Sequence, residues 1–198
     1  MGNRTRKLLT VGVIAAMTLS MAACTSGNDT SSSSGSSDKK ETKAGTGKIG
    51  VAMPTKDLQR WNQDGENMKK QLEDAGYEVD LQFASNDVAT QVSQVENMVS
   101  GGCDAIVIGS IDGESLGTPL KQAEEQGIPV ISYDRLIMNS SAVTYYATFD
   151  NYLVGQKQGE YIVDALDLDN TDGPYNLEIF TGDPGDNNVN FFYGGAME

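Results

Sequence analysis

Histidine is absent from the 198-residue chain, and cysteine occurs only twice, as Cys24 and Cys103. Without histidine, most zinc sites and every mechanism that needs a Ser-His or Cys-His pair are excluded. The sequence also lacks a phosphate loop ending in Lys-Ser or Lys-Thr, and no GxGxxG motif follows its first predicted strand. These absences predict that the chain is not an enzyme and uses no cofactor and no metal. They disfavour the enzyme alternative, a surface hydrolase on an α/β scaffold.

Basic side chains are scarce in most of the chain. The full sequence has 14 Lys and Arg against 28 Asp and Glu, and residues 1–47 contain six of the first group and three of the second. Residues 48–198 therefore have 8 basic and 25 acidic side chains, which is a net charge of −17. A surface with this charge repels nucleic acid and anionic lipid headgroups, so no nucleic-acid partner is expected.

The first 24 residues have the pattern of an export signal. Three basic residues precede an apolar stretch over residues 8–21, which is too short to span a bilayer as a stable helix. The sequence Met21-Ala22-Ala23-Cys24 resembles the lipobox of bacterial lipoproteins, with Met21 in the place where Leu is usual. The pattern predicts a signal peptide over 1–24, lipid attachment at Cys24 and a location on the outer face of the cell membrane. An ordinary signal peptide with a coincidental cysteine is the alternative.

Residues 25–47 predict a disordered tether rich in Ser and Gly. They contain no large apolar side chain and so cannot bury enough surface to offset the entropy of ordering. A flexible coil of this length has a mean reach of roughly 25 Å. The tether would hold a domain clear of a membrane surface.

Beyond residue 47 two kinds of segment alternate. Apolar runs rich in β-branched residues predict strands at 49–53, 79–84, 105–109, 129–133 and 143–149. Amphipathic stretches predict helices at about 59–75, 88–100, 115–126 and 151–166. A further strand is predicted at 176–181, followed by a Gly-rich turn and a helix from Asn188. Cys103, just before the third run, is expected to be a small buried apolar residue.

Residues with favourable capping chemistry flank the predicted helices. Asp87 and Ser115 lie where N-caps are expected, because their side-chain oxygens accept bonds from the first turn. Gly76, Gly101-Gly102 and Gly127 follow helices, where a left-handed backbone is favoured. Alternating strands and helices predict an α/β fold with a parallel sheet flanked by helices. Ligands of such sheets bind outside the carboxyl ends of the strands, so site residues should follow strands.

Polar side chains and one indole follow these strands. Arg60 and Trp61 come after the first, Asp134-Arg135 after the fourth, Asp150-Asn151 after the fifth and residues 186–188 after the last. Carboxylates, amides and guanidinium groups make directional hydrogen bonds with hydroxyls, and an indole packs on the C–H face of a sugar ring. The residue types therefore predict a sugar site at this edge of the sheet.

The sequence from Lys48 onward resembles the periplasmic-type sugar-binding proteins of ABC transporters, in particular the xylose- and multiple-sugar-binding branch. The segments that carry the resemblance are KIGVAMPTKDLQRWNQDG, SQVENMVSGGCDAIVIGSIDG, GIPVISYDRLI, YYATFDNYLVGQKQGEYI and GDPGDNNVNFFYGGAM. The resemblance implies a type I periplasmic-binding-protein fold, in which two α/β lobes enclose the sugar. It implies a first lobe over 48–168, complete in part, and a second lobe only begun at 169–198.

By position, the resemblance implies seven sugar-binding residues: Arg60, Trp61, Asp134, Arg135, Asp186, Asn187 and Asn188. Trp61 would stack on the sugar, the Asp-Arg pair would grip its hydroxyls, and residues 186–188 would add polar contacts from the second lobe. The same residues could instead have structural roles. Trp61 could pack against the sheet as a core residue, the Asp-Arg pair could be a surface salt bridge, and Asn151 and residues 186–188 could cap helices.

These implications predict a lipid-anchored receptor of an ABC importer. It would capture a monosaccharide, either a xylose-like pentose or a hexose, in the cleft between its lobes and deliver it to the permease subunits in the membrane. The alternative is a sugar-sensing receptor that signals to a membrane kinase or a chemoreceptor. Members of the family continue well beyond this length, so the sequence is expected to be a fragment or a disrupted gene.

Overall fold

The structure, a computed structural model, describes residues 45–198. The predicted signal peptide, Cys24 and the predicted tether up to residue 44 lie outside the described residues. The last tether residues already bond to the domain. The Gly45 amide donates to the Ala75 carbonyl at 2.5 Å, and the Gly47 carbonyl accepts from the Glu78 amide at 2.9 Å.

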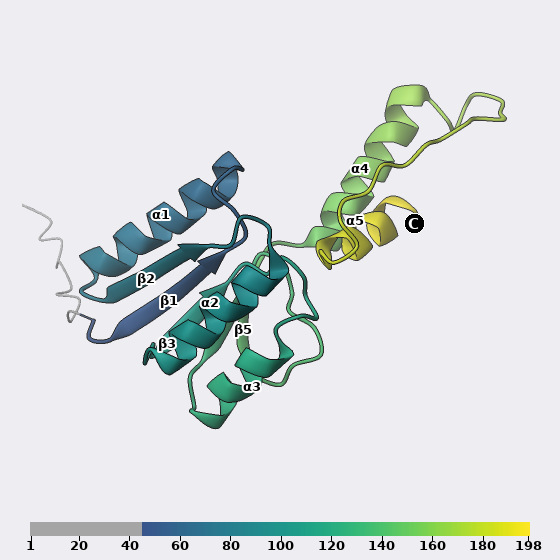
Figure 1. Cartoon of the computed structure of the whole chain (residues 1–198). Helices are drawn as coiled ribbons and strands as arrows, with labels where there is room; N and C mark the ends of the chain where they lie inside the picture. The colour runs from purple at the N-terminus through teal and green to yellow at the C-terminus, as the bar shows by residue number, and fades with distance from the viewer. Residues whose placement is uncertain (1–44) are drawn as a thin grey trace, which may run out of the picture. The chain divides into compact units, whose positions relative to one another are not determined.

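Five parallel strands form one sheet in the order β2-β1-β3-β4-β5 (Figure 1). The strands are β1 (Lys48–Met53), β2 (Glu78–Phe83), β3 (Ala105–Ile108), β4 (Val130–Tyr133) and β5 (Val143–Ala147). The helices are α1 (Gln59–Asp74), α2 (Val88–Ser100), α3 (Gly117–Glu125), α4 (Asn151–Leu166) and α5 (Asn188–Ala196). The predicted α/β class, the parallel sheet and the first five strands are confirmed.

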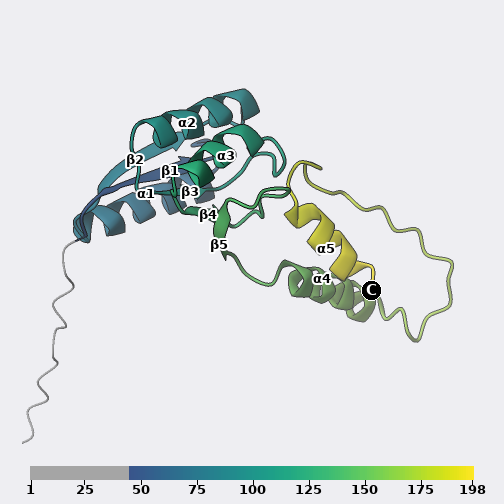
Figure 2. The ribbon, with the colours of Figure 1, turned by 90° about the horizontal axis from the view of Figure 1, so that it is seen from below.

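Helices cover both faces of the sheet, with α1 on one face and α2 and α3 on the other (Figure 2). Successive residues of a strand point to opposite faces. Ala52 of β1 therefore packs in the larger core cluster with α2 and α3, while Val51 packs in the smaller cluster with α1. Cys103 is buried in the larger cluster, and burial raises the pKa of its thiol. As predicted, it is a small buried apolar residue.

The direction of the chain connections reverses between β1 and β3. Strand β2 lies on one side of β1, while β3, β4 and β5 follow in order on the other side. At such a switch point the connections leave the carboxyl ends of neighbouring strands in opposite directions and open a crevice. The residues that follow β1, β3 and β4 share this edge, which is where the sequence predicted the site.

Most capping predictions are confirmed. The Asp87 carboxylate accepts from the Thr90 amide at 2.7 Å, and Gly76, Gly102 and Gly127 have φ angles of 97°, 75° and 70°. The prediction that Ser115 caps α3 is wrong. Leu116 precedes that helix, and the Ser115 hydroxyl instead donates to the Asp112 carbonyl at 3.1 Å.

The prediction of a sixth strand at 176–181 is also wrong, because the segment is irregular along its length. A strand needs a neighbour for its backbone N–H and C=O groups, and no strand of the described residues pairs with this segment. Its residues contact α4 and α5 instead. Leu177 and Ile179 line an apolar pocket of about 360 Å³ together with Ile162 of α4 and Phe192 of α5.

Helices α4 and α5 pack against each other through glycines. A Cβ atom at Gly155 would clash with the Phe192 carbonyl oxygen, and one at Gly159 would lie 2.6 Å from the Ala196 carbonyl oxygen. By this packing α4 belongs with α5. The sequence placed α4 in the first lobe, with a boundary after residue 168. We propose instead that the second lobe begins with α4, at Asn151.

The glycine packing predicts opposite effects for one substitution at two positions. Alanine is favoured over glycine inside a helix by up to about 1 kcal/mol. At Gly117, the first residue of α3, where a Cβ would meet nothing within 4 Å, Gly117→Ala should stabilise by a fraction of that amount. Gly159→Ala should destabilise by about 1–3 kcal/mol, because the new methyl group overpacks the helix contact. Urea denaturation of both variants tests this, and stabilisation at both positions would contradict the described packing.

Candidate functional site

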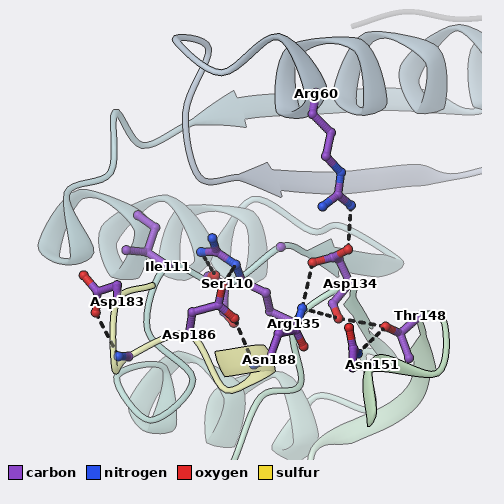
Figure 3. A network of polar contacts seen from close by, with 12 residues as sticks. Arg60, Ser110, Ile111, Asp134, Arg135, Thr148, Asn151, Asp183, Asp186 and Asn188 are labelled. Carbon is purple, nitrogen blue, oxygen red and sulfur yellow. Dashed lines mark hydrogen bonds and ion pairs between the residues drawn. The ribbon is translucent and has the colours of Figure 1, made fainter. Parts of the chain in front are cut away.

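A pocket of about 360 Å³ lies at the carboxyl edge of the sheet. It is lined by Leu58, Gln59, Arg60, Trp61, Asp134, Arg135, Phe149, Asp186, Asn188 and Phe192. Six of the seven predicted sugar-binding residues are in this lining. Asn187 is the exception, and its side-chain oxygen accepts from the Asn190 amide group at 3.3 Å. The six come from α1, from the end of β4, and from Asp186 and Asn188 at the start of α5. Figure 3 shows five of them, all but Trp61.

The backbone of Asp134 makes the turn that ends β4. Its φ angle of 65° lies in the left-handed region, which Asp tolerates better than most residues. The Asp134 amide donates to the Ala147 carbonyl at 2.8 Å. Its carbonyl accepts from the Thr148 hydroxyl at 2.9 Å and from the Tyr146 hydroxyl at 3.1 Å. These bonds to the end of β5 hold the turn in the conformation that directs the side chain into the pocket.

The Asp134 carboxylate is buried, with 5% of the residue exposed, and both of its oxygens have partners. Arg60 Nη2 lies 2.5 Å from Oδ2, and Asn188 Nδ2 donates to Oδ1 at 3.1 Å. A buried charge is stable only when it is paired and hydrogen-bonded. The carboxylate therefore joins α1 to the start of α5, as Figure 3 shows.

Arg60 lies between two carboxylates, because its Nε is 3.3 Å from Asp64 Oδ2 on the next turn of α1. Partial burial acts to lower the pKa of Arg60, but the hydrogen bond with Asp134 and the charges of Asp134 and Asp64 act to raise it, and the net effect is a raised pKa. The Tyr133 hydroxyl donates to Asp64 at 3.1 Å. Burial and the charge of Asp64 raise the pKa of Tyr133, so this hydroxyl keeps its proton at neutral pH.

Arg135 spans the pocket from the end of β4. Its Nη1 donates to the Ser110 carbonyl at 3.0 Å, in the turn after β3. Its Nε lies 2.9 Å from Asp186 Oδ2, a distance within ion-pair range. The N–H does not have hydrogen-bond geometry toward that oxygen, so this contact is an ion pair only. Arg135 thus connects the sheet to the segment before α5 by charge.

The Trp61 ring forms the floor of the pocket. Only 3% of Trp61 is exposed, and it packs with Val51 and Met53 in the smaller core cluster. The guanidinium carbons of Arg60 and Arg135 lie 4.4 and 5.2 Å from the centre of the ring. Trp61 therefore packs against the sheet, as the structural interpretation expects, and its ring also lines the pocket near two cations. Stacking of a sugar on this ring stays a prediction.

Asn188, at the start of α5, brings an unused acceptor into the pocket. Its Nδ2 donates to Asp134, but its buried Oδ1 accepts no hydrogen bond within residues 45–198. The Asp186 carboxylate accepts from the Asn188 amide at 3.0 Å, in the manner of a turn. Local turn bonding and pocket lining therefore coexist at 186–188. A buried amide oxygen without a donor suits a ligand that offers one.

Some residues of the site were missed from the sequence. Asp64 could have been found, because it lies four residues after Arg60 on the same helix face. Asn151 was left between capping and ligand contact. Asp150 caps α4 instead, accepting from the Leu153 amide at 2.9 Å, while the Asn151 side chain donates to the Thr148 hydroxyl at 3.2 Å. Nothing in the local sequence reveals that Ser110 presents its carbonyl to Arg135.

The described residues hold little that would support catalysis. No three His, Cys, Asp or Glu side chains in this part of the chain are placed to hold a metal ion. Sequence reasoning overlooked residues 113–117, GESLG, which have the GxSxG spacing of a nucleophile elbow. The Ser115 hydroxyl is bonded to a backbone carbonyl, and the sequence has no histidine to activate it.

Comparisons with known proteins place these features in one family. The family profile described as "Periplasmic binding protein domain" matches residues 49–198. The multiple sugar-binding periplasmic protein SbpA of Azospirillum brasilense is 53% identical over 149 residues, which cover 75% of this chain and 42% of SbpA. The D-xylose-binding periplasmic protein of Escherichia coli K12 is 38% identical over 151 residues, covering 76% of this chain and 44% of that protein.

A solved structure agrees with both sequence matches. It is an ABC transporter solute-binding protein from Clostridium phytofermentans with bound β-D-glucose, at 75% identity and a TM-score of 0.74. The match covers 76% of this chain and 46% of that one, so the chain spans less than half the length of the relatives it matches. The family binds solutes and is non-enzymatic, which confirms the prediction that this chain is not an enzyme. By its sequence and its fold, the chain belongs to the periplasmic binding protein family, in the branch of the xylose- and multiple-sugar-binding proteins of ABC transporters.

Proposed function

We propose that the pocket at the carboxyl edge of the sheet binds a monosaccharide. The observation that carries the proposal is the buried Asp134 carboxylate, which Arg60 and Asn188 hold in a pocket that Trp61 also lines. A pyranose presents hydroxyls that both donate and accept, around a ring with weakly apolar faces. Carboxylate, guanidinium and amide groups bind the first, and an indole packs on the second.

The charge balance of the pocket favours a neutral ligand. Arg60 and Arg135 are the only arginines of residues 48–198, and both line the pocket. Arg60 is paired with both Asp64 and Asp134, and Arg135 is paired with Asp186, so the carboxylates at these ion pairs outnumber the cations by one. A cation that is already paired with a carboxylate attracts a further carboxylate or phosphate only weakly. The hydroxyls of a sugar, by contrast, can join the existing hydrogen bonds as donors and acceptors. This balance supports a sugar over an amino acid or a phosphate ester.

The named relatives support the same ligand class. SbpA is named for multiple sugars, the Escherichia coli protein for D-xylose, and the Clostridium phytofermentans structure contains β-D-glucose. We therefore propose a pentose or hexose as the ligand of this site. Delivery to an ABC permease follows as a proposal for a protein of the length of those relatives, of which this chain spans less than half.

The proposed mechanism is closure of the lobes around the sugar. Three contacts join the sheet edge to residues 185–188: the Asp134–Asn188 hydrogen bond, the Arg135–Asp186 ion pair, and a backbone bond of 3.1 Å from the Gly113 amide to the Gly185 carbonyl. A sugar that contacts both sides stabilises the closed arrangement over the open one by its difference in affinity.

The first test is calorimetry of the full-length gene product against pentoses and hexoses. We expect binding of at least one neutral monosaccharide, and no binding of amino acids, because the pocket cations are already paired. Galactose, glucose, arabinose and xylose make a suitable panel, since they differ in hydroxyl geometry alone or by one hydroxymethyl group. Tight binding of an amino acid or a peptide, with no response to any sugar, would refute the proposed ligand class.

A second test removes one side chain from the site. Arg135→Ala should weaken sugar binding by about 10- to 100-fold, because a hydrogen bond to a charged group contributes about 1.5–3 kcal/mol. The thermal midpoint without sugar should change little. Lys121→Ala, which removes an exposed cation from α3, is the control and should leave the affinity unchanged. A large loss of stability with Arg135→Ala would assign this residue a structural role instead.

We further propose that Cys24 carries the lipid that anchors the protein. None of the helices in residues 45–198 combines the length and the hydropathy that a membrane span requires. Cys24→Ala should abolish lipid labelling and move the full-length protein from the membrane fraction to the soluble fraction. Cys103→Ala is the matched control, because Cys103 is buried in the core and should leave membrane attachment intact. Lipid labelling that persists in Cys24→Ala would refute this site of attachment.

A further inference from the structure

Gln91 of α2 is a buried polar residue on an apolar helix face. Only 1% of the residue is exposed, and the other buried positions of α2 are Val95, Met98 and Val99. Gln91 lies four residues before Val95, so both project from the face that packs on the sheet. A buried amide group costs free energy unless its nitrogen and oxygen both have partners. Its presence in this core therefore needs a physical reason.

Both polar atoms of Gln91 bond to the backbone just beyond β3. Its Nε2 donates to the Gly109 carbonyl at 2.9 Å, and its Oε1 accepts from the Ile111 amide at 2.8 Å. These two backbone groups lie on either side of Ser110. Strand β3 ends at Ile108, so the turn from Gly109 to Ile111 lies beyond the regular ladder. The Gln91 amide replaces that ladder and holds the turn at two points.

The turn held by Gln91 supports two residues of the pocket. The Ser110 carbonyl accepts from Arg135 Nη1 at 3.0 Å (Figure 3). At Gly109, an added Cβ atom would lie 3.3 Å from the edge of the Trp61 ring, so this part of the turn lies against the indole. A shift of the turn would therefore move the acceptor that orients the Arg135 guanidinium and the surface that confines Trp61.

We propose that Gln91 is a positioning residue of the sugar site, which sets the direction of the Arg135 guanidinium through the Ser110 carbonyl. Gln91 is not in the pocket lining, so it acts without touching the ligand. This inference rests on the proposed sugar binding and deepens it. Its physical basis is that a guanidinium group binds hydroxyls well only when its planar N–H groups have a fixed direction.

Gln94 on the same helix provides a matched control. It has the same side chain, and its Nε2 donates to the Phe83 carbonyl at 3.1 Å. Phe83 ends β2, which lies on the opposite side of β1 from β3. Loss of this one bond should therefore disturb the end of β2 without reaching Arg135, so Gln94→Met controls for the loss of a bond between α2 and the sheet.

The experiment measures sugar affinity and thermal midpoint in the full-length gene product. The variants are Gln91→Met, Gln94→Met, Arg135→Ala and the double variant of Gln91 and Arg135. Methionine has the length of glutamine but cannot make the two backbone bonds. We expect Gln91→Met to weaken sugar binding by about tenfold and Gln94→Met by less than about twofold. In the Arg135→Ala background, Gln91→Met should weaken binding by less than about twofold, because its effect passes through Arg135.

The same fold-change for Gln91→Met with and without Arg135 would overturn the inference. A lowered thermal midpoint with unchanged affinity would also overturn it. If Gln91→Met does not fold, Gln91→Leu replaces it, since this uncharged side chain also lacks the two backbone bonds and should show the same coupling to Arg135. Failure of the unsubstituted protein to bind any sugar would refute the proposed function and this inference with it. Normal sugar binding with Gln91→Met equal to Gln94→Met would refute the inference alone.

Discussion

The site depends on burial of one negative charge, the carboxylate of Asp134. A buried charge is tolerated only with close partners, and loss of one partner leaves the other charge uncompensated. Arg60 and Asn188 supply these partners from α1 and from the start of α5. The left-handed backbone of Asp134 gives the carboxylate its direction, and the end of β5 holds that backbone. Asp134 therefore links the end of β4, where the sheet places it, to the polar groups that line the pocket.

Local pattern was enough to predict the sheet. Each of the five strands was predicted from a short run of apolar and β-branched residues, and the strand ends lie within two residues of their predicted positions. The two clear errors concern features that depend on a neighbouring strand or on the exact residue at which a helix begins. Residues 176–181 have the composition of a strand but no neighbour among residues 45–198. Ser115 has a suitable hydroxyl, but helix α3 starts beyond its reach.

The positions that follow strands, together with the family resemblance, were enough to predict six residues that line one pocket. The residues behind them were not predictable, because their roles arise from packing between separate elements. In the sequence, Gln91 is only a polar residue on an apolar helix face. Its role becomes evident from its two hydrogen bonds to the turn after β3, which the sequence does not reveal. Asp64 could have been predicted, because it lies four residues after Arg60 in the predicted helix and so shares its face.

The cations over Trp61 give the molecule a further property. Trp61 is the only tryptophan in the 198 residues, and the guanidinium groups of Arg60 and Arg135 lie within about 5 Å of its ring centre. The emission of an indole responds to nearby charge and to exclusion of water. The intrinsic fluorescence of this chain therefore reports on the position of the two arginines, and the chain has an optical probe of its pocket without any added label.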